Sequence, residues 1–286
     1  MSKLIKNYQV LYYLINNEFF DCVLMKIELL MIGNEILIGK TQDTNSNWMA
    51  KRITKHGHQV KRITTIGDDL DTISTTFNAI LQRKPDLIIT SGGIGPTFDD
   101  MTLAGIAKGL GRALELNEKA YKSIKKVYER AFHKGLLKLE GMTKEREKMA
   151  YLPTGAIPLP NTVGTAPGVK IREETTTIFI LPGVPAELKS MFRNVITPIL
   201  KKEKGNFVEK GFTFMGIGES QIAPYITELE NKYPQLWIKT HPRIGLSVEV
   251  EVSITAFNIE NGEELAEKVL VEIREIILKL KGKIKD

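Results

Sequence analysis

Residues 86–102 read DLIITSGGIGPTFDDMT, and this segment contains the strongest structural signal in the chain. The apolar run Asp86–Thr90 is typical of a short buried strand. Three glycines within Gly92–Gly95 follow it, and they free the backbone to turn its N–H groups toward a ligand. Thr102 is expected to cap the next helix, whose positive end would point the same way. This order predicts an anion-binding loop at the edge of an α/β sheet.

Strands and helices alternate on both sides of this loop. The expected strands are Lys26–Ile32, His58–Ile66, Gly168–Arg172 and Thr176–Leu181, and the expected helices are Thr44–His56, Leu70–Arg83, 118–134 and Pro185–Lys202. Such alternation predicts a three-layer α/β/α, doubly wound and mostly parallel sheet. A Lys/Gly-rich linker at Lys201–Asn206 precedes a strand–helix–strand–strand–helix pattern, which predicts a smaller α+β domain.

The expected domains are therefore 25–204 and 206–286, preceded by an extension, 1–24, that fits no periodic pattern. Either this extension is helical, or Met25 is the natural start of the protein. In composition, 42% hydrophobic and 26% charged residues exclude a disordered or fibrous chain. No apolar run approaches the roughly 20 residues of a membrane helix, and the single cysteine, Cys22, excludes an internal disulfide or a Cys-based zinc site. We expect a cytoplasmic protein.

Charge is unevenly distributed along the chain. The net charge is +6, and the basic excess lies in residues 25–204, while residues 205–286 carry more acidic than basic groups. Segment 118–134 combines an apolar stripe, including Tyr121, Ile124 and Tyr128, with lysines on the other side. This pattern favours an amphipathic surface helix over a nucleic-acid patch.

Two carboxylates, Asp99 and Asp100, follow the glycines. They would repel a bound phosphate unless a divalent cation lay between them, and magnesium takes ligands from one or two carboxylates plus substrate phosphates. The alternative is an acidic turn with one Asp near the helix cap. The loop is neither a Walker loop, since no Gly-Lys-Ser/Thr follows, nor a dinucleotide fingerprint, since the third glycine is missing.

Three more loops follow expected strands or lie close to them. They are Gly33–Gly39, which contains Glu35; Asn161–Gly168; and Pro182–Glu187. In a doubly wound sheet the loops after parallel strands gather at the carboxyl edge, where ligands bind. We therefore expect Gly33–Gly39 and Pro182–Glu187 to meet the glycine loop at one crevice, and Asn161–Gly168 offers backbone donors and hydroxyls. Glu187 fits a helix-capping role as well as a catalytic one, and the Asn161–Gly168 segment could equally be a plain turn.

The segment 90–102 resembles the hallmark loop of the CinA (competence/damage-inducible protein A) family. The supporting motifs are Gly33–Leu37, Asp43–Asn45, Gly67–Asp69, Gly164–Gly168 and Leu181–Pro185. The resemblance is collinear over residues 25–200, and this domain of the family is similar to the molybdopterin-binding domain of the MoaB, MogA and MoeA proteins. Residues 206–286 look like the KH-type domain that follows it, with Gly216–Ser220 at the expected place.

This resemblance implies a domain that handles a phosphate-bearing nucleotide or pterin. It points to metal-dependent ADP-ribose pyrophosphatase activity, with Glu35, Asp99 and Asp100 as catalytic residues and Asp99 and Asp100 as ligands of magnesium or cobalt. The implied ligand-binding residues are Ser91, Gly92, Gly93, Gly95, Pro96, Thr97, Thr102, Asn45, Asp68, Thr165, Pro167, Gly168, Pro182, Gly183 and Glu187. The three loop glycines would hold phosphates through their backbone N–H groups. The chain departs from many family members in having no room for a C-terminal amidohydrolase domain, and residues 1–24 lie outside the pattern.

Two other functions are alternatives to this hydrolase. The first is a molybdopterin-binding or adenylyl-transferring protein of molybdenum-cofactor synthesis, for which Phe98 and Trp48 are the candidate stacking aromatics. The second is nucleic-acid binding by residues 206–286, which we predict to fail, because the region is acidic and Gly216-Ile217-Gly218 is one residue short of a Gly-x-x-Gly loop. We expect this module to pack beside the crevice or to form a homodimer interface.

Overall fold

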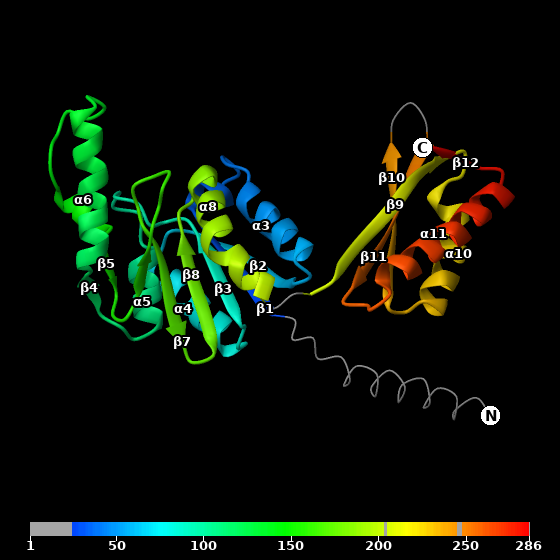
Figure 1. The fold of residues 1–286 in the computed structure, drawn as a ribbon, viewed down its shortest axis with the longest axis horizontal. Helices are drawn as coiled ribbons and strands as arrows, with labels where there is room; N and C mark the ends of the chain where they lie inside the picture. The colour runs from blue at the N-terminus through cyan, green and yellow to red at the C-terminus, as the bar shows by residue number, and fades with distance from the viewer. Residues whose placement is uncertain (1–24, 203–204, 245–247, 286) are drawn as a thin grey trace. The chain divides into compact units, whose positions relative to one another are not determined.

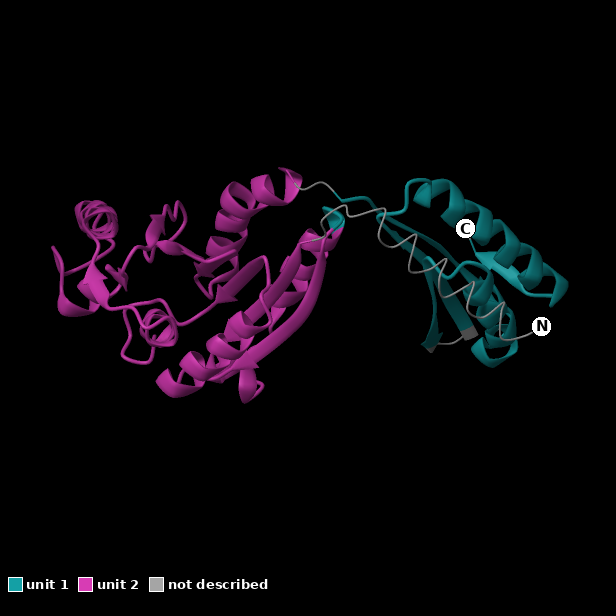
Figure 2. Cartoon of the chain, turned by 90° about the horizontal axis from the view of Figure 1, so that it is seen from below, with its two compact units in different colours: residues 1–24, 55–57, 204–286 teal, residues 25–54, 58–203 magenta. Residues whose placement is uncertain are grey.

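The computed structural model describes residues 25–202, 205–244 and 248–285 (Figure 1). The extension 1–24, with Cys22, lies outside the described residues. The chain divides into two compact units, which Figure 2 colours separately. Within the described ranges, no helix has both the length and the apolar character needed to cross a membrane.

The α/β unit, residues 25–54 and 58–203 (magenta in Figure 2), is built on a six-stranded sheet with the order β2-β1-β3-β8-β7-β6. The strands are β1 (Lys26–Ile32), β2 (Gln59–Ile66), β3 (Leu87–Ser91), β6 (Ile157–Leu159), β7 (Gly168–Glu173) and β8 (Thr176–Leu181). The first four in this order run parallel, β7 is antiparallel to β8, and β6 is antiparallel to β7, so the α/β fold is confirmed with a mixed sheet. Two residues connect β7 to β8, and so short a connection permits only antiparallel pairing.

Helices and a small ribbon surround this sheet. The helices are α2 (Asn34–Leu37), α3 (Thr44–Lys55), α4 (Leu70–Gln82), α5 (Thr102–Gly109), α6 (Glu118–His133), α7 (Lys144–Lys148), α8 (Pro185–Met191) and α9 (Thr197–Lys202), with a π-helical segment, η1 (Phe192–Ile196), between the last two. A separate antiparallel ribbon pairs β4 (Leu114–Leu116) with β5 (Tyr151–Pro153). The expected single helix from Pro185 is thus α8, η1 and α9 in succession.

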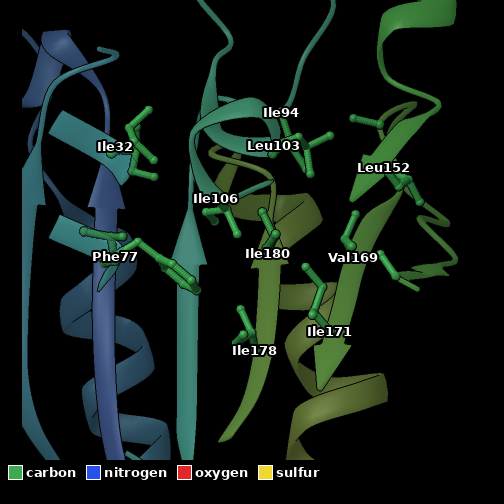
Figure 3. Close-up of a cluster of buried hydrophobic side chains, with 14 of the residues drawn as sticks. Ile32, Phe77, Ile94, Leu103, Ile106, Leu152, Val169, Ile171, Ile178 and Ile180 are labelled. Carbon is green, nitrogen blue, oxygen red and sulfur yellow. The ribbon is translucent and has the colours of Figure 1, made fainter. Parts of the chain in front are cut away.

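The sheet is buried on both faces because helices cover both of them, and successive residues of each strand point to opposite faces. One face carries Leu30 and Ile88 and packs against α4 and α5 in the cluster of Figure 3. The opposite face carries Leu29 and Ile89, which pack against α3 and the α8–α9 segment. Two separate cores on one sheet define the expected three layers. The amphipathic helix α6 buries Ile124 against the first of these cores.

The C-terminal unit (teal in Figure 2) is an antiparallel sheet covered by two helices. Its elements are β9 (Phe207–Met215), α10 (Glu219–Lys232), β10 (Leu236–Ile244), β11 (Val248–Phe257), α11 (Gly262–Lys279) and β12 (Lys283–Lys285), and the strand order is β10-β11-β9-β12. The helices and the sheet share one apolar core. Strand β12 was not expected from the sequence, because three residues are too few to show a period. It forms by pairing with β9, where Ile284 lies opposite Phe214.

Candidate functional site

A cleft of about 530 Å³ lies where β1, β2, β3 and β8 end. Strand β1 lies between β2 and β3, so the chain reverses its direction across the sheet there, and such a switch point is where ligands bind in open α/β sheets. The loops after all four strands line the cleft. The lining residues are Ile32, Gly33, Glu35, Asp68, Gly92, Gly93, Ile94, Gly95, Pro96, Asp99, Asp100, Tyr128, Met149, Thr165, Ala166, Pro182, Gly183, Val184 and Glu187.

The glycine loop crosses closely over the end of β1. Gly92 has φ +110, and a Cβ atom there would lie 2.0 Å from the carbonyl oxygen of Ile32. Its N–H donates to the carbonyl oxygen of Leu181 in this structure, and the role of Gly92 in phosphate binding stays a prediction. The N–H groups of Gly93 and Gly95 have no hydrogen-bond partner among the described residues. The loop therefore has open donors at these two positions.

Thr102 ties the loop to α5, although it was expected to cap that helix. Helix α5 has Met101 at its N-cap and no side-chain capping hydrogen bond. The buried Thr102 hydroxyl instead donates to the carbonyl oxygen of Gly92 at 2.8 Å. The expectation of a Thr102 cap is therefore corrected: its hydroxyl holds the glycine loop in place.

Asn45 fastens three segments of the chain together. Its Nδ2 donates to Ser91 Oγ at 3.1 Å and to the carbonyl oxygen of Gly183 at 2.7 Å. Asn45 and Ser91 are both buried, and neither lines the cleft. In this structure Asn45 ties the end of β3 to the loop after β8, so these two predicted ligand-binding residues hold the loops in place.

Five carboxylates line the cleft, and no Lys or Arg of the described residues does. They belong to Glu35, Asp68, Asp99, Asp100 and Glu187. The Glu35 carboxylate folds back over Gly33, where a Cβ atom would lie 2.6 Å from Glu35 Oε1. Every charged side chain of the described residues that lines this cleft is negative, so a phosphate that enters it would meet no side chain of opposite charge. Positive charge must therefore accompany such a ligand.

Glu187 is held by the loop opposite. Asn161 Nδ2 donates to Glu187 Oε2 at 2.6 Å and to the carbonyl oxygen of Ala166 at 2.9 Å. A Cβ atom on Gly164 would lie within 2.3 Å of this carboxyl group. Glu187 thus links the Asn161–Gly168 loop to the first turn of α8, in addition to facing the cleft.

Asp68 and Asn34 join the loops after β2 and β1. Asn34 N donates to Asp68 Oδ2 at 2.8 Å, and Asp68 N donates to Asn34 Oδ1 at 3.3 Å. Burial raises the pKa of the Asp68 carboxyl, and the charges of Glu35, Asp99 and Asp100 raise it further, against the Asn34 hydrogen bond that lowers it. The four carboxylates therefore repel one another across the cleft, although burial is the larger cause of the raised pKa.

Asp99 and Asp100 differ in their surroundings. Thr97 N and the Thr97 hydroxyl both donate to Asp100 Oδ2, at 2.9 and 2.5 Å. The pKa of the exposed Asp99 is lowered by the Thr97 hydroxyl first and also by the charge of Lys148.

The donor set suits a hard divalent cation that is shared with a ligand. Among the described residues there is no group of three or more His, Cys, Asp or Glu side chains arranged to hold a metal ion. Magnesium is usually bound by one or two carboxylates together with substrate phosphates. Asp99 and Asp100 fit that arrangement.

Twelve of the sequence-predicted residues line the cleft, and six do not. Those outside the lining are Asn45, Ser91, Thr97, Thr102, Pro167 and Gly168. The candidate stacking aromatics also lie elsewhere: Trp48 packs edge-on against Phe192, with 5.2 Å between ring centroids, and Phe98 is 87% exposed without lining the cleft.

Tyr128 of α6 is the aromatic residue of the cleft. The guanidinium carbon of Arg146 lies 4.0 Å from its ring centroid. Sequence reasoning missed this residue because Tyr128 belongs to the apolar stripe of an amphipathic helix. A tyrosine in such a stripe gives no signal that distinguishes a cleft wall from a core position.

The fold and the cleft define an α/β protein with an acidic cleft at the switch point of its sheet. Residues 28–202 match the family described as "Probable molybdopterin binding domain", and the chain belongs to this family. A protein of Sulfurisphaera tokodaii is 41% identical over 262 residues, which cover 90% of this chain and 97% of the relative. A protein of Sulfolobus acidocaldarius is 40% identical over 264 residues, covering 91% and 97%.

A solved structure gives the same assignment. The crystal structure of the protein CinA from Thermoplasma acidophilum is 40% identical, with a TM-score of 0.55, and the match covers 61% of this chain and 98% of that one. The chain is therefore CinA-like, as the resemblance of the glycine loop predicted.

Proposed function

We propose that this protein hydrolyses the pyrophosphate of ADP-ribose or a related nucleotide with the help of a divalent cation, magnesium or cobalt. The observation that carries the proposal is the cleft itself: five carboxylates and open backbone N–H groups lie together without a Lys or Arg in the lining. Donors of this kind suit a phosphate, and the carboxylates suit the cation that must accompany it. A polyphosphate bound with its cation satisfies both sets of groups.

Each of these groups has its own role in the proposed hydrolysis. The N–H groups of Gly93 and Gly95 hold phosphate oxygens, and Asp99 and Asp100 would hold the cation, which would supply charge neutralisation and a more acidic water. Glu35 accepts the proton of the attacking water. The water oxygen bonds to one phosphorus while the bridging P–O bond breaks, so that ADP-ribose yields AMP and ribose 5-phosphate.

The test is AMP release from ADP-ribose with magnesium or cobalt by the full chain. Asp100→Asn retains an oxygen that can accept from Thr97 N but removes the negative charge, and we expect it to slow release by at least about 100-fold. Asp71→Asn is the matched control, since Asp71 is exposed and pairs with Lys108 outside the cleft. Equal rates for wild type and Asp100→Asn would remove the metal role, and no release by either would remove this substrate.

A second candidate function is molybdopterin binding or adenylyl transfer in molybdenum-cofactor synthesis. Two observations favour it: the family match over residues 28–202 and the Tyr128 ring in the cleft wall, on which a pterin could stack. Co-purification of a fluorescent pterin with the wild-type protein, reduced by Tyr128→Ala, would support this function. A ligand-free protein that binds ADP-ribose tightly would count against it.

We propose that the C-terminal unit is a KH-type module. It does not bind nucleic acid and serves packing or homodimer formation. Acidic and basic side chains pair across its sheet, as in Arg243–Glu251 at 2.7 Å and Lys285–Glu249 at 2.9 Å. Such pairing leaves little uncompensated positive charge for phosphates. Filter binding of single-stranded RNA to the full chain is the test, and micromolar, salt-sensitive retention would contradict the proposal.

A further inference from the structure

A second cleft, of about 550 Å³, borders the same glycine loop. It shares Gly93–Gly95, Asp100 and Met149 with the acidic cleft. Its other walls come from α5, α7 and the β4–β5 ribbon. A ligand that crosses the glycine loop would therefore reach two chemically different spaces.

The ribbon contributes an exposed apolar wall. Leu116 pairs with Tyr151 across the ribbon, and residues two apart on one strand share a face, so Leu114, Leu116 and Tyr151 lie on one side. They are 38%, 39% and 37% exposed, whereas Leu152 on the other side is 2% exposed in the core. Leu114 and Tyr151 line the second cleft, and Leu116 does not. Clustered apolar side chains left in water indicate a contact surface for a ligand or partner.

Lysines distinguish this cleft from the acidic one. Lys144 and Lys148 line it together with the carboxylates of Asp100 and Glu147. Both carboxylates already accept hydrogen bonds, Asp100 from Thr97 and Glu147 from the Tyr151 hydroxyl at 3.3 Å. Lys148 Nζ donates to the carbonyl oxygen of Thr97, which is a neutral partner that a phosphate can replace. The second cleft thus combines an apolar wall with ammonium groups next to the glycine loop.

We propose that the second cleft binds a heterocycle carrying a single phosphate, with the ring on Leu114 and Tyr151 and the phosphate near Lys148. This inference rests on the proposed function. It places the nucleoside monophosphate half of the substrate in the second cleft, with the pyrophosphate crossing the glycine loop toward Asp99. The ring is chosen over a protein partner because the lysines adjoin the loop's open N–H groups, which suit a small anion.

The test measures AMP binding to the full chain by calorimetry in EDTA, where no hydrolysis occurs. Leu114→Glu places a carboxylate in the second cleft, and Leu116→Glu places the same group on the same ribbon face outside it. We expect Leu114→Glu to weaken AMP binding at least tenfold and Leu116→Glu to change it less than twofold. Lys148→Met is expected to lower the affinity for AMP toward that for adenosine, while leaving adenosine binding unchanged.

The outcomes separate this inference from the proposed function. No AMP binding by the wild type, or equal effects of the two Leu variants, overturns the inference. A Leu114→Glu variant that loses a dimer in light scattering but binds AMP normally also overturns it, because the wall is then an interface between copies. If AMP binds in the second cleft as expected but ADP-ribose is never hydrolysed, the inference stands and the hydrolase proposal fails. If ADP-ribose is hydrolysed with an unchanged KM in Leu114→Glu, the reverse holds.

Discussion

The Thr102 hydroxyl donates to the carbonyl oxygen of Gly92, and a Cβ atom on Gly93 would lie 2.2 Å from that same hydroxyl oxygen. The glycine loop is therefore closed by a side chain ten residues further along the chain. With φ +64 at Gly93, both the backbone conformation and the space favour glycine there. The loop's shape depends on this contact.

Thr102→Val keeps the side-chain shape and removes the hydroxyl. Thr102 is fully buried, so the Gly92 carbonyl oxygen would lose its partner away from water. We expect a loss of about 1–3 kcal/mol in the free energy of unfolding, measured with urea. Thr102→Ser keeps the hydroxyl and serves as the control. A Val variant as stable as the Ser variant would show that this hydrogen bond does not hold the loop.

Gly33→Ala tests whether the position of Glu35 matters to catalysis. The new Cβ atom would occupy the place of the Glu35 carboxylate, and that flexible side chain would have to move away. We expect an unchanged melting temperature, with kcat lowered about tenfold by misplacement of the base. Glu35→Gln should lower kcat by about 100-fold. A normal kcat in both variants would remove Glu35 from the mechanism.

Asp68→Asn is expected to stabilise the protein more at neutral than at acidic pH. Because the folded-state pKa of Asp68 is raised, mainly by burial, the wild type loses stability as pH rises from the unfolded-state pKa through the folded-state one. The Asn variant lacks this loss and can still accept from Asn34 N. Urea unfolding at a series of pH values should show a variant–wild-type difference that grows with pH and then levels off. A difference that grows toward acid pH would contradict the assignment.

Arg83→Met should expose the cost of a buried carboxylate. Glu28 is 5% exposed on β1 and accepts from Arg83 Nε at 2.8 Å and Nη2 at 2.6 Å. Since the Arg83 side chain is 34% exposed, water can partly replace it, and we expect a loss of about 2 kcal/mol, below that of a fully buried pair. The double variant Glu28→Met/Arg83→Met should be more stable than Arg83→Met alone. The reverse order in urea unfolding would mean that Glu28 is not paired in solution.

Much of the fold could be predicted because its signals are local. The short apolar run of β1 and Pro185 at the start of α8 each act within a few residues. Strands β4, β5, β6 and β12 escaped prediction, because each has three residues, too few to show a period, and exists only by pairing with another strand.

The candidate site divides in the same way. Glycines and carboxylates after each parallel strand marked the cleft from the sequence alone, since the carboxyl ends of parallel strands meet at one edge. The sequence could not show that the Gly92 N–H is used by Leu181, that Asn45 supports the loops from beneath, or that Tyr128 faces the cleft. These depend on where atoms far apart in the chain come to lie. Local chemistry determined which loops matter in this protein, and only tertiary packing decided which of their groups stay free to meet a ligand.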